Sequence, residues 1–171
     1  MDKVVFIIGG NLGDRRVLIE EAKRFLVLQF GESKLTSSIF ETAAWGGKSF
    51  GKYLNQVLIF ETKESPETIL TKILGIEEKM GRKREVKWGD RIMDIDILYF
   101  GNKIIQSPSL TIPHPSIQER RFVLEPLNEI IPEFPHPVLA KKQKELLELC
   151  SDTSEVVVFE KRNPEYFPGL L

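Results

Sequence analysis

Residues 91–101 read RIMDIDILYFG, a strongly hydrophobic stretch that contains two aspartates and ends at a glycine. Its length and its isoleucine and aromatic content predict a β-strand over residues 92–100. Alternate side chains of a strand point to the same face, so Asp94 and Asp96 would share one face, roughly 6–7 Å apart at their Cα atoms. We expect the opposite, core-facing side to carry Met93, Ile95, Ile97 and Tyr99.

The flanking sequence predicts further strands and helices in alternation. Apolar or β-branched runs predict strands at residues 4–8, 34–42, 53–62, 103–106 and 156–159. Apolar residues at helical spacing, with capping residues before them, predict helices at residues 14–29, 65–80, from 116 onward and 138–150. The β-α-β-β-α-β order predicts an α+β, ferredoxin-like core with an antiparallel sheet and C-terminal helical and strand additions, in a single domain over residues 1–171.

Two local patterns predict how the chain turns after residue 100. Gly101 and Asn102 are typical of a two-residue type II′ turn that leads into the strand at 103–106. Ser116 and Glu119 have the spacing of a capping box, which predicts that a helix opens there. Pro126 is then expected to interrupt or end this helix, because proline lacks the backbone N–H that the helix requires.

Composition bounds the class of protein. The 171 residues include 24 Lys and Arg against 25 Asp and Glu, and 42% are hydrophobic. These values exclude a disordered chain, a collagen and a coiled-coil rod, and the charge balance argues against a general nucleic-acid or membrane-surface binder. A lone cysteine, Cys150, allows no intrachain disulfide, and no run approaches the roughly 20 apolar residues that span a bilayer. We therefore expect a cytoplasmic protein, without nucleic-acid or membrane partners, that is a monomer.

The aspartate pair is the sharpest chemical feature. Two neighbouring carboxylates repel each other unless a positive charge lies between them. Hard oxygen ligands on a rigid strand suit Mg²⁺, which proteins hold through one or two carboxylates plus substrate phosphates. From the pair alone, a solvated polar stripe on an edge strand is about equally plausible.

A cationic loop precedes this strand and favours the metal–phosphate interpretation. Within ten residues it carries Arg82, Lys83, Arg84, Lys87 and Arg91, with Trp88 among them. A charge run of this kind is usually only a solvated loop. Arginines that lead directly into a carboxylate pair are, however, what a polyphosphate site requires, because guanidinium groups clamp the oxygens that the metal leaves free.

Two further clusters have polar and aromatic character. His114 lies between two prolines and is followed by Arg120, Arg121 and Phe122; it is either structural or a phosphate contact. Residues 42–55 combine the aromatic residues of a ring-binding site with one amide: Trp45, Phe50, Tyr53 and Asn55. An aromatic sandwich with an amide suits a flat polar heterocycle, although a simple cover for the core is the alternative.

Taken together, these clusters resemble the 6-hydroxymethyl-7,8-dihydropterin pyrophosphokinase family of folate biosynthesis. The resemblance rests on four stretches: GGNLGDR (9–15), SSIFETAAWG to YLNQ (37–56), EEKMGRKREVKWGDRIMDIDILYFG (77–101) and IPHPSIQERRFVLEPLNEIIPE (112–133). It implies a ferredoxin-like α+β domain that transfers the diphosphate of ATP, as one unit, to the hydroxymethyl group of the pterin and releases AMP.

The resemblance also implies roles for individual residues. Asp94 and Asp96 would hold two Mg²⁺ ions that bridge the ATP phosphates. Catalytic roles would fall to Arg82, Arg91, Asp94, Asp96 and His114. ATP would be bound by Glu77, Arg84, Trp88, Ile97, Thr111, His114 and Arg120. The pterin would be bound by Thr42, Trp45, Tyr53, Asn55 and Phe122.

The chain departs from the family pattern at several positions, and two alternative functions follow. Gly10 stands where serine is usual, Trp45 replaces an aliphatic residue, and Asp90 stands where proline is common, directly before Arg91. Asp90 supports an inactive homologue that acts as a subunit or scaffold. A ferredoxin-like RNA-binding module is the second alternative, and the near-neutral charge and the aspartate pair argue against it.

Overall fold

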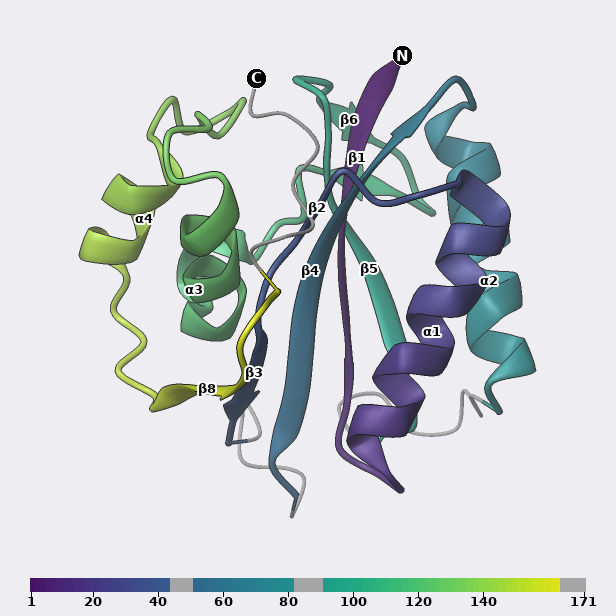
Figure 1. The fold of residues 1–171 in the computed structure, drawn as a ribbon. Helices are drawn as coiled ribbons and strands as arrows, with labels where there is room; N and C mark the ends of the chain where they lie inside the picture. The colour runs from purple at the N-terminus through teal and green to yellow at the C-terminus, as the bar shows by residue number, and fades with distance from the viewer. Residues whose placement is uncertain (44–50, 82–90, 164–171) are drawn as a thin grey trace.

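The computed structural model of the chain describes residues 1–43, 51–81 and 91–163 (Figure 1). The main sheet is built from β1 (Asp2–Gly10), β2 (Leu35–Thr36), β3 (Ile39–Thr42), β4 (Tyr53–Thr62), β5 (Asp94–Phe100) and β8 (Val156–Glu160). A small second sheet pairs β6 (Ile105–Gln106) with β7 (Thr111–Ile112). The helices are α1 (Arg15–Phe30), α2 (Pro66–Lys79), α3 (Arg121–Ile130) and α4 (Gln143–Leu149), with a 3₁₀ turn, η2 (Ile117–Glu119).

The main sheet is antiparallel and runs in the order β5-β1-β4-β3-β8, with β2 paired to β4. The first strand of the chain therefore lies between β5 and β4, as the split βαβ arrangement requires. This confirms the predicted ferredoxin-like α+β fold. The C-terminal strand β8 extends the sheet beyond β3, which confirms the predicted strand addition.

Helices cover both faces of the sheet, so the protein has two hydrophobic cores (Figure 1). The core under α1 and α2 includes Phe6, Ile8, Leu54, Leu58, Phe60, Ile69 and Ile73. The core under α3 and α4 includes Val5, Ile7, Val57, Ile59, Tyr99, Val123 and Leu127. Alternate residues of β4 thus enter opposite cores, as the period of a strand dictates. Below, the two sides of the sheet are called the α1 face and the α3 face.

The first two helices begin at polar caps and end at glycines, as expected. The side chain of Asp14 accepts a hydrogen bond from Val17 N, and that of Ser65 accepts one from Thr68 N. These caps satisfy backbone N–H groups that lack partners inside the helix. Past the end of α2, Gly81 has a φ of 87°, a conformation that favours glycine.

Four details of the prediction are wrong. The segment 34–42 forms two short strands, because Ser37 turns inward: its hydroxyl accepts a hydrogen bond from Val57 N. The segment 103–106 yields only the two-residue β6, which pairs with β7 instead of forming a hairpin with β5. The predicted helix at 138–150 is confined to Gln143–Leu149. Tyr99 lies in the α3-face core, because a bulge in the β1–β5 pairing reverses the alternation after Ile97.

The segment after His114 also differs from expectation. The side chain of Ser116 makes no capping hydrogen bond, and the chain forms the 3₁₀ turn η2 before α3 begins at Arg121. The helix α3 then runs through Pro126 to Ile130. Pro126 is the sixth residue of α3, so at most one backbone hydrogen bond near the start of the helix is lost. Burial of the proline ring offsets that loss.

In the ranges 1–43, 51–81 and 91–163, no helix has the length and apolar character needed to cross a membrane.

Gly75 offers a direct test of the α2 assignment. It lies inside the helix, and a Cβ built on it would have no heavy atom within 4 Å. Gly75→Ala is therefore expected to raise the free energy of unfolding by about 0.5–1 kcal/mol, because alanine loses less backbone entropy on helix formation. Urea unfolding of the two proteins measures the difference. A loss of stability would mean that residue 75 is not in open helical surroundings.

Candidate active site

Three adjacent strands bring the predicted site residues into one row on the α3 face. Gly9 of β1 is paired with Asn55 of β4 on one side and with Asp94 of β5 on the other. Directly paired residues point to the same face, and neighbouring strands lie about 4.8 Å apart, so Asn55 and Asp94 are separated by about 10 Å at their Cα atoms. The next row on the same face contains Asp96, paired with Ile7.

Two glycines make this row possible. A Cβ on Gly9 would lie 2.1 Å from Asn55 Oδ1 and 2.5 Å from the carbonyl oxygen of Leu54. A Cβ on Gly10 would lie 2.2 Å from the carbonyl oxygen of Ile92. Real Cβ atoms do not approach that closely, so both positions exclude a side chain in this arrangement. The departure from serine at Gly10 therefore matches the close passage of residues 91–92.

The aspartate pair carries unbalanced negative charge. Burial, together with the negative charges of Asp94 and Glu77, raises the pKa of Asp96 to about 7, and Arg120 and Arg91 oppose this shift only in part. Arg91 forms a 2.9 Å ion pair between Nη1 and Asp94 Oδ2. A carboxylate with such a raised pKa indicates a place for added positive charge.

The donor set suits a divalent cation that is completed by substrate. Among the described residues no group of three or more His, Cys, Asp or Glu side chains has the geometry of a metal site. The two strand carboxylates supply hard oxygen ligands, and Mg²⁺ is commonly held by one or two carboxylates while phosphate oxygens and water fill the other positions. The residues present therefore fit Mg²⁺ bound together with a polyphosphate.

His114 is held as a neutral hydrogen-bond donor. Its Nδ1 accepts a hydrogen bond from Ser116 N at 3.2 Å, so in the neutral ring the proton is on Nε2. Burial, aided by the positive charge of Arg120, lowers the pKa of His114 to about 4, against a smaller opposing effect of Asp94. Its backbone is fixed by a bond from its N–H to the carbonyl oxygen of Leu98, which anchors it to β5.

Arg120 acts electrostatically on this histidine, and Phe122 lies beside Arg120. The Cζ atom of the Arg120 guanidinium is 5.9 Å from the centre of the Phe122 ring. Burial lowers the pKa of Arg120, and the negative charges of Asp96, Glu119 and Asp94 oppose that shift. Arg120 therefore belongs electrostatically to the carboxylate cluster.

Asn55 is the most distinctive residue on the other side of the row. It is 7% exposed, and among the described residues its Nδ2 has no hydrogen-bond partner. An unpaired buried donor is costly, and a substrate acceptor would satisfy it. Tyr53 begins the same strand, and the Thr42 hydroxyl donates to the carbonyl oxygen of Glu155, which ties β3 to the segment before β8.

Three of the residues that the resemblance assigns to ATP, Glu77, Ile97 and Thr111, come from three different elements. Glu77 is 2% exposed, and its Oε1 accepts a 2.7 Å hydrogen bond from Ile95 N, so it fixes β5 from the end of α2. Ile97 packs in the α1-face core, on the opposite side of β5 from Asp96. Thr111 is exposed on β7. The anchoring role of Glu77 was missed, and its place four residues after Ile73, on the buried face of the helix, was the available signal.

Four predicted site residues lie outside the described residues: Trp45, Arg82, Arg84 and Trp88. Asn11 fixes Arg91: Asn11 Oδ1 accepts from Arg91 N at 2.8 Å, and Asn11 N donates to the Arg91 carbonyl oxygen at 2.9 Å.

Comparison of the sequence with known proteins finds one family over most of the chain. A model of the family described as 7,8-dihydro-6-hydroxymethylpterin-pyrophosphokinase (HPPK) matches residues 5–132. The 2-amino-4-hydroxy-6-hydroxymethyldihydropteridine pyrophosphokinase of Aquifex aeolicus is 39% identical over 145 residues, which cover 85% of this chain and 90% of that protein. The protein of the same name from Bacillus subtilis is 38% identical over 133 residues, covering 76% and 79%.

Solved structures agree with the fold. A crystal structure of Plasmodium falciparum HPPK-DHPS with pteroate superposes with a TM-score of 0.71 at 20% sequence identity. The match covers 86% of this chain and 42% of that longer one. At 20% identity this structural similarity establishes only the fold of the chain. The family is established by the more similar sequence relatives.

Proposed function

Because the chain belongs to the HPPK family and is a pyrophosphokinase of folate biosynthesis, we propose that it transfers the diphosphate of ATP to the hydroxymethyl group of 6-hydroxymethyl-7,8-dihydropterin at the row Asn55–Gly9–Asp94. AMP and the pterin diphosphate are the products. The systematic name of this activity is 2-amino-4-hydroxy-6-hydroxymethyldihydropteridine diphosphokinase, a transferase that uses ATP.

The spacing within that row is the observation that supports the proposal. Asn55, whose Nδ2 has no hydrogen-bond partner among the described residues, and Asp94 are about 10 Å apart at their Cα atoms on one face, with a glycine between them. A bicyclic pterin that is held by its amide edge at Asn55 would direct its hydroxymethyl arm toward the carboxylates. Alignment of this kind accounts for much of the catalysis of phosphoryl-type transfer.

The carboxylates would hold the metal. Asp94 and Asp96 would bind Mg²⁺, two ions in our proposal, together with the ATP phosphates. The ions would neutralise phosphate charge and favour ionisation of the attacking hydroxyl. Arg91 pairs with Asp94, so it is within reach of the place where phosphate would lie.

The cationic and neutral donors have separate roles in this proposal. Neutral His114 would donate from Nε2 to a phosphate oxygen, and Arg120 would contact the same chain of phosphates. Arg82 and Arg91 would stabilise the charge on the transferred group and on the departing AMP. Arg84 and Trp88 would close over bound ATP, and Trp45 and Phe122 would enclose the pterin ring with Tyr53.

The remaining expectations are proposals as well. We propose that the enzyme works as a single domain and a monomer, with ATP and the pterin as partners and without nucleic acid or membrane. We place it in the cytoplasm, a location that the single free cysteine, Cys150, fits.

The identity of the nucleotide product tests the function. Incubation with ATP, Mg²⁺ and 6-hydroxymethyl-7,8-dihydropterin is expected to give AMP and pterin diphosphate in equal amounts, and AMP formation should depend on the pterin. Chromatography of the quenched reaction separates AMP from ADP. ADP as the product would mean transfer of a single phosphoryl group, and binding of Mg²⁺–ATP without any product would favour the inactive homologue.

A further inference from the structure

A cavity lies on the α1 face of the sheet, away from the row that carries the proposed chemistry. It has a volume of about 360 Å³ and is bordered by α1, by the segment from Glu32 to Ile39, by Gln56 of β4 and by residues 160–163 at and after the end of β8. Its apolar wall consists of Val27 and Ile39, which also belong to the α1-face core. Small-molecule sites commonly have volumes of about 300–1,000 Å³, so the cavity is large enough for a ligand of modest size.

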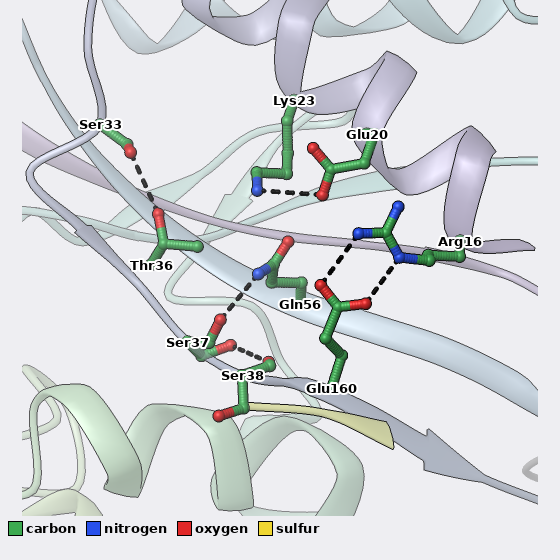
Figure 2. A network of polar contacts seen from close by, with 9 residues as sticks. All are labelled: Arg16, Glu20, Lys23, Ser33, Thr36, Ser37, Ser38, Gln56 and Glu160. Atoms are coloured by element: carbon green, nitrogen blue, oxygen red, sulfur yellow. Dashed lines mark hydrogen bonds and ion pairs between the residues drawn. The ribbon is translucent and has the colours of Figure 1, made fainter. Parts of the chain in front are cut away.

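Gln56 forms the polar floor of this cavity. It alternates along β4 with Leu54 and Leu58 of the α1-face core, and it is 4% exposed. Its Nε2 donates to the carbonyl oxygen of Ser37 at 2.7 Å, which fixes the orientation of the amide. Its Oε1 is buried and has no hydrogen-bond partner among the described residues. In Figure 2 this oxygen points away from Ser37, toward Lys23 and Glu20 of α1.

Two hydroxyl groups that also line the cavity provide a hydrogen-bond donor. The oxygens of Ser33 and Thr36 lie 3.0 Å apart, and both residues line the cavity (Figure 2). One hydroxyl hydrogen makes this bond, so the second hydroxyl hydrogen of the pair is left to donate elsewhere. The cavity therefore presents an unfilled acceptor, Gln56 Oε1, and a spare hydroxyl donor.

The charges at the rim balance. Three carboxylates and three cations line the cavity: Glu20, Glu32, Glu160, Lys23, Lys161 and Arg162. Two of the carboxylates are already engaged, Glu20 with Lys23 at 3.3 Å and Glu160 with Arg16 at 2.6 Å (Figure 2). A charged ligand would gain no net attraction here and would lose hydration, so the rim favours an uncharged one.

We propose that this cavity is a second ligand site, which binds a small uncharged molecule carrying an N–H donor beside a carbonyl acceptor, such as a cyclic amide, a cyclic urea or a nucleobase. The ligand N–H donates to Gln56 Oε1, and the ligand carbonyl accepts the spare hydrogen of the Ser33–Thr36 pair. The apolar wall of Val27 and Ile39 covers the remainder of the ring. The site stands on its own residues and does not depend on the proposed catalysis.

A matched pair of probes tests the donor requirement in the unmodified protein. Uracil carries two N–H groups, and 1,3-dimethyluracil has the same ring and carbonyls without them. Titration of ¹⁵N-labelled protein with uracil is expected to shift the side-chain amide signals of Gln56 and the backbone signal of Ser37, with saturation in the millimolar range. The dimethyl compound should bind at least about tenfold more weakly, because it leaves the Gln56 oxygen unpaired. The site is refuted by equal binding of the two compounds, by no shifts up to the solubility limit of uracil, or by shifts confined to Asn55 and His114.

A variant pair locates the binding. Gln56→Met retains the length of the side chain and removes its oxygen, so uracil should bind at least about tenfold more weakly. Gln106→Met makes the same change on exposed β6, outside the cavity, and should bind uracil as the unmodified protein does. Uracil binding that survives in folded Gln56→Met would overturn the assignment. If that variant does not fold, the comparison of the two probes in the unmodified protein still decides the question.

Discussion

Asp96→Asn is expected to reduce turnover by on the order of a thousandfold while making the metal-free protein more stable at pH 8. The loss of turnover follows because the amide removes one of the two strand carboxylates proposed to hold Mg²⁺. The gain in stability follows because the fold raises the pKa of Asp96 from an ordinary value of 3.8 to about 7, through burial and the charges of Asp94 and Glu77. Asparagine carries no charge that the fold must accommodate.

The pH dependence of this gain has a definite sign. A raised carboxyl pKa means that, between about pH 4 and pH 7, the folded chain holds a proton that the unfolded chain has released. The stability of the unmodified protein therefore falls as pH rises through this window, and it lacks this contribution above it. Asp96→Asn should match the unmodified protein near pH 4 and exceed it by about 1–3 kcal/mol at pH 8.

Asp152 provides a control of opposite sign. Burial alone would raise the pKa of Asp152, but hydrogen bonds from Ser154 and from the backbone of Arg121 outweigh burial and lower it. Asp152→Asn should therefore destabilise the protein at pH 8. Thermal unfolding of both variants in EDTA, and again with Mg²⁺ and ATP, separates the two cases. A destabilised Asp96→Asn protein, or one with near-normal turnover, would contradict the proposed metal site.

Strand periodicity predicted part of the fold well, and the same periodicity made the aspartate pair stand out. The alternation of the first half of β5 depends only on the geometry of a strand, and Met93, Ile95 and Ile97 were predicted on the correct face. The aspartate pair was recognisable because it violates the apolar pattern around it. A residue that weakens the fold, and that burial alone does not explain, indicates function.

What the sequence did not reveal depends on contacts between distant segments. The bulge that moves Tyr99 to the α3-face core arises from pairing with β1, where Val5 and Phe6 oppose Tyr99 and Ile97. Once there, the Tyr99 hydroxyl lies within hydrogen-bond distance of Gln143 of α4, a partner 44 residues away. No local propensity encodes such a register change, because β-strand preference is dominated by tertiary packing.

The capping pattern at Ser116 failed for a related reason. The residues have the right types and spacing, but the backbone N–H of Ser116 donates to His114 Nδ1, and the chain tightens into a 3₁₀ turn. The local geometry there orients the ring of His114 instead of opening an α-helix. This local hydrogen bond therefore replaces the capping bond, and α3 starts later, at Arg121.

In the sequence Gly9 was only one residue of the GGNLGDR stretch, and its place in β1 with close contacts to β4 makes it a prominent element of the site. Gly9→Ala places a Cβ 2.1 Å from Asn55 Oδ1 and 2.5 Å from the Leu54 carbonyl oxygen. The Asn55 amide must move away, and β4 must separate from β1. We expect the Michaelis constant for the pterin to rise at least about tenfold and the free energy of unfolding to fall by about 1–3 kcal/mol.

Two comparisons distinguish this effect from a general loss of stability. Gly75→Ala adds the same methyl group in open space and should stabilise the protein, so addition of a methyl group is not itself harmful. Asn55→Ala should raise the pterin Michaelis constant, and adding Gly9→Ala to it should raise that constant little further, because both changes act through the same amide. The Michaelis constant for Mg²⁺–ATP should change little in either single variant. A Gly9→Ala enzyme with unchanged stability and pterin kinetics would show that β1 and β4 do not approach each other as closely as the pairing of Gly9 with Asn55 requires.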